Sequence, residues 1–364
     1  MAYLWRKMVL FQCGSGSYFL TARFDQTMSG TKGLGLFLVP ASWNGQKNLY
    51  SIRRLKDKLG TRSMATGEID FNGAYAFAVG RVEEGIHIVM DNVLHLSRLF
   101  NSFCVLGMAR RAYTISRAYA QHRQTFSHPI IQYPLVMENL ARIKVENSAM
   151  IAAMCATASR QDQYDVGEST DDNSKLLLRL LVNMMKYLTA LWSVKHIHHA
   201  LDVLAGNGTI ETFSSLPRLL RDCIICENWE GTHNLLRAQI LKDILKYDIE
   251  QIYLTFMQTE LATLKKYSLH TQAIQVELDK LKSELTQFRQ QSSLLQQLQI
   301  RQIVDKMAIL YCALTFLLEA IDQQKSKKIT TKLDGYQYFC LLHLEQQELK
   351  YDDDYLELIT RIVS

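Results

Sequence analysis

Residues 200–243 read ALDVLAGNGTIETFSSLPRLLRDCIICENWEGTHNLLRAQILKD, and this stretch decides the fold. It begins with an apolar run that ends in the loop AGNG at 205–208, and a second run starts at Pro217. A further helix is expected over Asn234–Lys242, with Thr232 placed as its N-cap. The stretch therefore alternates apolar segments with short glycine-containing turns.

A single carboxylate, Glu230, stands in the second of these turns between Trp229 and Gly231. Gly231 allows the backbone to turn tightly before the next helix. A carboxylate in this position can be aimed at one point while its surroundings tune its pKa, so Glu230 is a candidate general base. A glutamate at a helix start also stabilises the helix dipole, and the residues alone leave both interpretations open.

The same stretch resembles the C-terminal signature of the flavin-dependent acyl-CoA dehydrogenase family. In that family a loop rich in Gly and Asn precedes an Arg-Asp pair and then an aromatic-Glu-Gly-Thr sequence. Here the three parts are residues 206–208, Arg221-Asp222 and residues 229–232, and the spacing from Arg221 to Glu230 fits without a gap. The resemblance extends over about residues 17–243, roughly two thirds of the chain.

Composition fits a globular protein, since 48% of the 364 residues are hydrophobic and 21% are charged. The formal net charge of +5 suits anionic ligands such as nucleotides or coenzyme A, and is too small to argue for nucleic acid. The 7 cysteines are scattered and odd in number, which fits reduced thiols. We find no signal peptide and no apolar run long enough to span a membrane, so a cytoplasmic location is expected.

Residues 1–84 are expected to form strands and turns. Gly-rich stretches separate short β-rich runs such as Tyr18–Ala22 and Leu36–Pro40, and residues 67–73 indicate a further strand. This region resembles the second half of the family's middle β-domain. The match is best at residues 54–63, RLKDKLGTRS, which are similar to the alkylation-response (AidB-like) branch.

From about Gly85 the periodicity becomes helical. In a first helix, to about Gln124, apolar residues recur every three or four positions and predict one buried face made of Val89, Val93, Leu96, Phe100 and Phe103. Helices are also expected over about 131–158 and 175–204, with a polar loop at 160–174. Together with the helix after Glu230 they predict a four-helix bundle, which is also the C-terminal domain of the resembled family.

Residues 248–364 are expected to form a helical extension. Apolar residues at heptad spacing, Ile274, Leu278, Leu281, Leu285 and Phe288, cover about two repeats, too few for a coiled coil, so this segment should pack back on the bundle. The predicted fold is therefore α+β and predominantly α. It comprises a partial middle β-domain (1–84), a four-helix bundle (85–247) and a helical extension (248–364).

For Glu230, the resemblance implies the removal of the pro-R α-proton of an acyl-CoA while a β-hydride passes to the flavin. An α-CH is a poor acid, so the base should be desolvated with a raised pKa, and the thioester oxygen must be stabilised. In the family the backbone N–H of the base helps to hold that oxygen, and Gly231 permits such an approach. Arg98 falls where a family arginine lies near the acyl-CoA, with a salt bridge inside the bundle as the alternative.

Further residues resemble the family's contacts with flavin adenine dinucleotide (FAD). Arg123, Thr125 and Phe126 match an Arg-x-Thr-Phe-Gly element that reaches the FAD diphosphate and adenine across a dimer interface, with Ser127 in place of the usual glycine. Arginine suits a phosphate clamp. Without the resemblance, Arg123 would be read as an exposed helix end.

The glycine-containing turns supply the other FAD candidates. Gly206 and Gly208 would let the backbone approach the adenine nucleotide, although a Gly-Asn-Gly sequence alone is usually a helix C-cap and turn. Thr232 and Asn234 fall where the family has a Thr and usually a Gln that contact FAD, and Asn234 is the shorter side chain.

Two cysteine and histidine motifs do not indicate a metal. Among His196, His198 and His199 only the first and last can share a helix face, and no third ligand is evident, so no metal is expected. Cys223 and Cys226 form a lone CxxC with apolar residues between them, and are expected to be core thiols.

Two functions are compatible with these observations. The first is an FAD-dependent oxidoreductase of fatty acid metabolism that dehydrogenates an acyl-CoA as a dimer or tetramer, with an unknown electron acceptor. The second is a catalytically impaired, AidB-like relative that acts in assembly or in association with DNA. The family's N-terminal helical domain and first middle-domain strands have no counterpart in this sequence, so the resemblance implies an N-terminally truncated relative.

Overall fold

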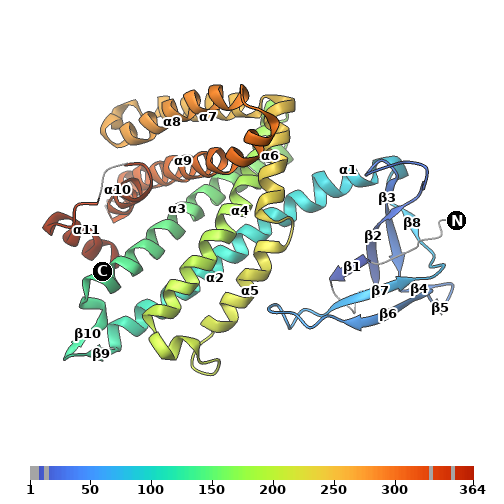
Figure 1. Ribbon diagram of the computed structural model, residues 1–364, viewed down its shortest axis with the longest axis horizontal. Coiled ribbons are helices and arrows are strands. Elements are labelled where there is room, and N and C mark those ends of the chain that lie inside the picture. Colours follow the sequence, from blue (N-terminus) through green and yellow to red (C-terminus); the bar gives the residue numbers. More distant parts are fainter. Residues whose placement is uncertain (1–7, 12–15, 328–330, 346–348) are drawn as a thin grey trace. The chain divides into compact units, whose positions relative to one another are not determined.

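The computed structural model describes residues 8–11, 16–327, 331–345 and 349–364. The chain divides into two compact units, residues 1–97 and 98–364, and the division falls in the first turn of helix α2 (His95–His122). Most strands lie in the first unit and long helices dominate the second (Figure 1), which confirms the predicted α+β, predominantly α fold. The domain boundaries after residues 84 and 247 stay predictions.

The first unit is built from short antiparallel strands. One sheet has the order β1-β7-β6, another β2-β3-β8, and β4 and β5 form a hairpin. Their bounds are β1 (Met8–Phe11), β2 (Ser17–Arg23), β3 (Leu34–Pro40), β4 (Ser42–Trp43), β5 (Gln46–Lys47), β6 (Tyr50–Leu55), β7 (Thr66–Phe71) and β8 (Phe77–Ala78). Burial alternates along β2, where Tyr18, Leu20 and Ala22 face a small core, as the period of a strand requires.

Asn48 ties the turns of this unit together. Its Nδ2 donates to the carbonyl oxygens of Pro40 and Tyr75 at 2.7 and 2.9 Å, and its Oδ1 accepts from the Tyr75 N–H at 2.9 Å. After β8 the chain becomes helical through η1 (Val82–Glu84), α1 (Gly85–Ile88) and a π-helical turn, η2 (Val89–Leu94). The helical signal from Gly85 onward is thus confirmed.

The second unit contains α2 and the helices that follow it. A small hairpin, β9 (Gln124–Thr125) with β10 (His128–Pro129), and the turn η3 (Ile130–Gln132) lead into the others. Their bounds are α3 (Pro134–Asp165), α4 (Asp172–Val203), η4 (Ala205–Thr209), α5 (Leu216–Asn228), α6 (His233–Tyr247), α7 (Ile249–Thr263), η5 (Lys265–Tyr267), α8 (Ser268–Arg289), α9 (Ser293–Lys327), α10 (Thr331–His343) and α11 (Asp353–Val363).

Helix α4 lies at the centre of this unit and contacts α3, α5, α6, α7 and α9 (Figure 1). Its start is fixed by Asp171, whose carboxylate accepts from the Ser174 N–H at 3.0 Å as an N-cap. Proline occupies the first turn of α3 and of α5, where its missing N–H costs nothing. The four predicted helices are present, and α5 is an additional helix that packs on α4.

Two expectations about the helices were wrong. The residues predicted to be a buried face are largely exposed: Val93 is 49%, Leu96 41%, Phe100 75% and Phe103 38% exposed. The inward face of α2 instead carries other apolar residues, such as Leu99, Val105 and Leu106, together with the polar Arg98, Asn101 and Ser102, which hydrogen-bond within the unit. The predicted loop at 160–174 is also shorter than expected, because α3 continues to Asp165.

The extension after residue 247 packs on the bundle, through α7 on α4 and through α9 on α3, α4 and α6. All five heptad residues of α8, from Ile274 to Phe288, are buried, but α8 lies mainly against α9, another helix of the extension. A single hydrophobic core runs from Leu99 on α2 to Val363 on α11 and includes residues from both sides of position 247.

Candidate active site

The Glu230 turn joins α5 to α6 through an unusual backbone. Glu230 has φ +59° and Gly231 has φ +108°, both in the left-handed region. For a glutamate this conformation costs on the order of 1–3 kcal/mol and persists only where surrounding groups hold it. The turn is therefore strained at the predicted catalytic residue.

Arg98 holds this turn from α2. The side chain is only 5% exposed, and its Nε donates to the Glu230 carbonyl oxygen at 3.0 Å. Its Nη1 donates to Asn183 Oδ1 on α4 at 2.6 Å and to Gln239 Oε1 on α6 at 3.3 Å. Side chains of α4 and α6 thus orient the Arg98 guanidinium against the main chain of the candidate base. These three partners are a carbonyl and two amides, so the bonds are not the salt bridge that was the alternative for Arg98.

A second buried cation, Lys186 of α4, holds the other side of the turn. Its Nζ donates to the Gly231 carbonyl oxygen at 2.7 Å and to the Glu227 carbonyl oxygen at 3.1 Å. The side chain is completely buried. Arg98 and Lys186 together bind the main chain before, at and after Glu230, and leave its carboxylate free of these bonds.

The electrostatics of the turn suit a base that must be reactive yet ionised. Burial raises the pKa of Glu230, while the charges of Arg98 and Lys186 oppose that rise. Burial, reinforced by Arg98, lowers the pKa of Lys186 to about 8. A desolvated carboxylate beside two fixed cations can accept a proton from a weak carbon acid, because its basicity is raised and its position is fixed.

Thr232 and Asn234 lie at the start of α6, next to Glu230. Thr232 is the N-cap residue, but its side chain makes no capping hydrogen bond within the described part of the chain. Both side chains are exposed. The first N–H groups of α6 therefore lack a side-chain cap, and with the Thr232 hydroxyl and the Asn234 amide they form a set of donors beside the candidate base.

The two glycines of the 205–208 loop differ in their surroundings. A Cβ on Gly208 would lie 2.3 Å from the Leu201 carbonyl oxygen, so packing against α4 alone requires glycine there. A Cβ on Gly206 would meet no atom of the described residues within 4 Å. Of the two, only Gly206 presents an open backbone to a ligand.

Arg123, Thr125 and Phe126 lie at the far end of α2, in the β9–β10 hairpin. Phe126 is 92% exposed and Arg123 is exposed. Phe126 and Ser127 have φ +49° and +70°, so both central residues of this turn are left-handed, and Ser127 occupies a position that favours glycine. The Thr125 carbonyl oxygen accepts from the Tyr133 hydroxyl at 2.8 Å, which fixes the hairpin to the start of α3.

The predicted site residues form two separate groups. Arg98, Gly231, Thr232 and Asn234 surround Glu230, whereas Gly206 and Gly208 lie near the hairpin, since Asn207 Nδ2 donates to Tyr119 Oη near the end of α2 at 3.1 Å. Along α2, Arg98 and His122 are about 36 Å apart, and along α4, Lys186 and Leu201 are about 22 Å apart. The Glu230 turn and the glycine loop therefore share no contact.

Lys186 and Asn183 were missed by the sequence reasoning. The available signal was two polar residues three positions apart inside the apolar run Leu180–Trp192, LLVNMMKYLTALW, which places both on one face of a buried helix. Among the residues that the structure describes, no group of three His, Cys, Asp or Glu could hold a metal ion, and no helix could cross a membrane.

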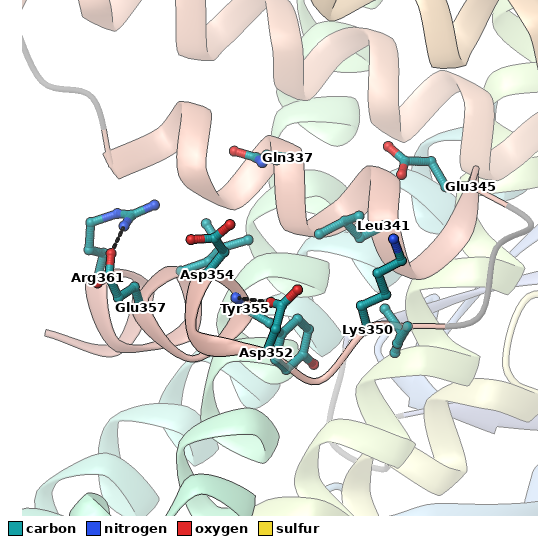
Figure 2. A pocket seen from close by; sticks show the side chains of 11 residues that line it. Gln337, Leu341, Glu345, Lys350, Asp352, Asp354, Tyr355, Glu357 and Arg361 are labelled. Carbon is teal, nitrogen blue, oxygen red and sulfur yellow. Dashed lines mark hydrogen bonds and ion pairs between the residues drawn. The ribbon is translucent and has the colours of Figure 1, made fainter.

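A cavity of about 420 Å³ lies elsewhere, between α10 and α11. Figure 2 shows its polar lining, in which the main-chain N–H of Tyr355 donates a hydrogen bond to Asp352 and Arg361 forms an ion pair with Glu357. None of the predicted site residues lines this cavity.

Comparisons with known proteins show what the chain that carries this arrangement is similar to. Residues 83–245 match the acyl-CoA dehydrogenase C-terminal domain. The chain is 32% identical over 218 residues to the putative acyl-CoA dehydrogenase AidB of Escherichia coli K12, a match that covers 59% of this chain and 38% of that protein. It spans about a third of the length of the first curated relatives that it matches.

Two solved structures share the fold. ACDH-11 of Caenorhabditis elegans in complex with C11-CoA superposes with a TM-score of 0.80 at 22% identity, over 94% of this chain and 62% of that one. An acyl-CoA dehydrogenase of Bacillus anthracis complexed with FAD superposes with a TM-score of 0.75 at 18% identity, over 96% of this chain and 64% of that one. The matched residues include Glu230, Arg98 and Lys186, and over residues 83–245 the chain is similar to the acyl-CoA dehydrogenase C-terminal domain.

Proposed function

We propose that this chain supports the FAD-dependent α,β-dehydrogenation of an acyl-CoA thioester, with Glu230 as the general base. The observation that carries the proposal is the Glu230 turn, a left-handed and partly buried glutamate whose main chain is bound by Arg98 and Lys186. A side chain that only stabilised the helix dipole would need neither the strained backbone nor two buried cations.

The chain's own groups would act on the proton. Glu230 accepts the α-proton, and its raised pKa makes it a stronger base than an exposed glutamate. Arg98 and Lys186 fix the turn, so that little reorganisation is needed at the moment of proton transfer. The resemblance assigns the thioester oxygen to the N–H of Glu230, where the developing negative charge would be stabilised.

The donors beside Glu230 fit a flavin. Thr232, Asn234 and the first N–H groups of α6 offer hydroxyl, amide and main-chain donors of the kind that bind carbonyl and phosphate oxygens. When bound, the flavin accepts the hydride from the β-carbon. FAD and acyl-CoA are named in the Bacillus anthracis and Caenorhabditis elegans structures respectively, and we extend both to this chain on the basis of the shared fold.

The second group of residues favours a homo-oligomer. Arg123, Thr125 and Phe126 lie on an exposed hairpin about 36 Å along α2 from Arg98, too far for both arginines to bind one flavin. An arginine held in this way can clamp the diphosphate of a cofactor bound by a second copy, as the resemblance implies. Gly206, near the same end of α2, would then belong to that second cofactor site.

The test is a pair of glutamine variants at the end of α5. Purified protein supplied with FAD should show flavin absorbance bands and reduce an artificial electron acceptor with an acyl-CoA. E230Q should keep the flavin and lose turnover by a factor of about 10² or more, because the base is gone while its shape remains. The matched control is E227Q, since the Glu227 carboxylate bonds His233 at 3.2 Å and only its carbonyl contacts Lys186.

Equal turnover in E230Q and E227Q would remove Glu230 as the base. Protein that binds no FAD, but binds duplex DNA in a salt-dependent manner, would favour the catalytically impaired, DNA-associated alternative instead.

A further inference from the structure

Three cysteines gather where α2 meets α5, just before the Glu230 turn. Cys104 on α2 is exposed, whereas Cys223 and Cys226 on α5 are buried. Asn101 Nδ2 donates to the Cys226 carbonyl oxygen at 3.1 Å, which brings the two helices together at this point. Cys104 follows Asn101 by three residues and so lies one turn further along nearly the same face of α2.

The thiol groups of Cys104 and Cys226 interact with each other across the two helices. This interaction lowers the pKa of the Cys104 thiol, although burial opposes the shift, and it raises the pKa of Cys226. Cys104 therefore ionises more readily than an ordinary cysteine and has a neutral thiol beside it. Cys155 on α3 is also exposed, but burial raises its pKa.

We propose that Cys104 is a site of oxidative modification by hydroperoxides and that Cys226 is its resolving thiol, so that oxidation joins α2 to α5 through a Cys104–Cys226 disulfide. An exposed thiolate paired with a buried thiol is the arrangement that such a reaction needs, because the first sulfur must meet the oxidant and the second must meet only the first.

The chemistry balances with a hydroperoxide as the oxidant. The Cys104 thiolate attacks one peroxide oxygen, the O–O bond breaks, and the other oxygen leaves as water or an alcohol after taking a proton. Cys104 becomes a sulfenic acid, two electrons having passed from sulfur to the peroxide. Cys226 then attacks the Cys104 sulfur, the S–S bond forms, and the S–O bond breaks to release water with the proton of the Cys226 thiol.

The disulfide would lie four residues before Glu230 and would tie the last turns of α5 to α2. It would thus make the mobility of the candidate base sensitive to peroxide. The inference goes beyond the proposed dehydrogenase function and does not depend on it, because the disulfide can be measured in protein without flavin or substrate.

The first test uses an aromatic disulfide probe, 5,5′-dithiobis(2-nitrobenzoic acid), on full-length C13S/C155S protein at pH 7. Cys104 should release one thionitrobenzoate from the probe and Cys226 should then displace a second, giving about two equivalents per chain. With C226S added, about one equivalent should be released. Cys104 should also react faster than Cys155, measured in C13S/C104S protein, because its larger thiolate fraction outweighs its weaker nucleophilicity.

The second test treats wild-type protein with hydrogen peroxide, blocks free thiols, and searches tryptic peptides for a Cys104–Cys226 crosslink that a reductant removes. Circular dichroism confirms that each variant is folded. A single equivalent from C13S/C155S protein, a Cys104 no faster than Cys155, or a sulfinic acid on Cys104 without the crosslink would each overturn the proposal.

Discussion

At the scale of single residues, Lys186 shows how a buried side chain can hold the Glu230 turn through main-chain oxygens. A buried ammonium is costly unless it is paired, and the partners of Lys186 are two carbonyl oxygens rather than a carboxylate. Its lowered pKa is the measure of that cost. The folded state of this protein therefore holds the Lys186 proton less tightly than the unfolded chain does.

This difference predicts a pH dependence of stability. Between the folded pKa of about 8 and the unfolded value of 10.5, the unfolded chain keeps a proton that the folded protein has lost, so the free energy of unfolding rises with pH. Across this window, the free energy of unfolding of the wild type should rise by roughly 3 kcal/mol relative to that of K186M, as urea titrations at several pH values would show. K195M replaces an exposed lysine of the same helix and is the control, so its free energy of unfolding should depend on pH as that of the wild type does.

Glu230 and Arg98 could be proposed as neighbours from the sequence, whereas Lys186 could not, for a physical reason. Glu230 stands in a motif whose glycine and aromatic neighbours mark a turn, and Arg98 falls at a motif-defined distance from Arg123. Lys186 contacts main-chain oxygens 41 and 45 residues away, and any residue type presents the same carbonyl. A carbonyl partner leaves no trace in the sequence.

At the scale of elements, the positions of the helices were predictable but the orientation of α2 was not. Apolar periodicity selects the face with Phe100 and Phe103, and that face is exposed in this chain. The inward face is stabilised by specific bonds, from Arg98 to Asn183 and from Asn101 to the Cys226 carbonyl. Apolar side chains such as Leu99, Val105 and Leu106 lie on the buried face as well, so periodicity alone could not choose between the two faces of α2.

The loop after α4 offers a second prediction, because two glycines in one turn have opposite surroundings. G208A should destabilise the protein by about 2–3 kcal/mol, since its Cβ would collide with the Leu201 carbonyl oxygen. G206A faces open space and should change the free energy of unfolding by less than about 0.5 kcal/mol. Urea denaturation of both variants measures the contrast.

Flavin binding separates the two roles of this loop. A folded G206A variant that loses affinity for FAD would support Gly206 as a cofactor contact. Equal stability of G206A and G208A would contradict the packing described for η4.

At the scale of the whole molecule, the second unit is held together through Glu146. This buried carboxylate bonds His196 Nε2 on α4 at 2.7 Å and His343 Nε2 on α10 at 3.1 Å. Burial opposes its ionisation, but the two histidine bonds hold the pKa of Glu146 well below its usual range. The His343 ring also stacks on the Trp192 ring, with the ring centroids 4.9 Å apart, so α3, α4 and α10 meet at one polar cluster.

The last prediction concerns cooperativity. E146Q should lower stability at neutral pH, and the difference from wild type should shrink below about pH 4.3, because the stabilisation from a depressed carboxyl pKa is lost as the group protonates. Trp192 reports on the Glu146 cluster and Trp229 on the Glu230 turn. In variants that keep only one of these tryptophans, E146Q should shift both urea midpoints equally, because one core runs from Leu99 to Val363. A shift at Trp192 alone would show that the Glu146 cluster and the Glu230 turn unfold independently of each other.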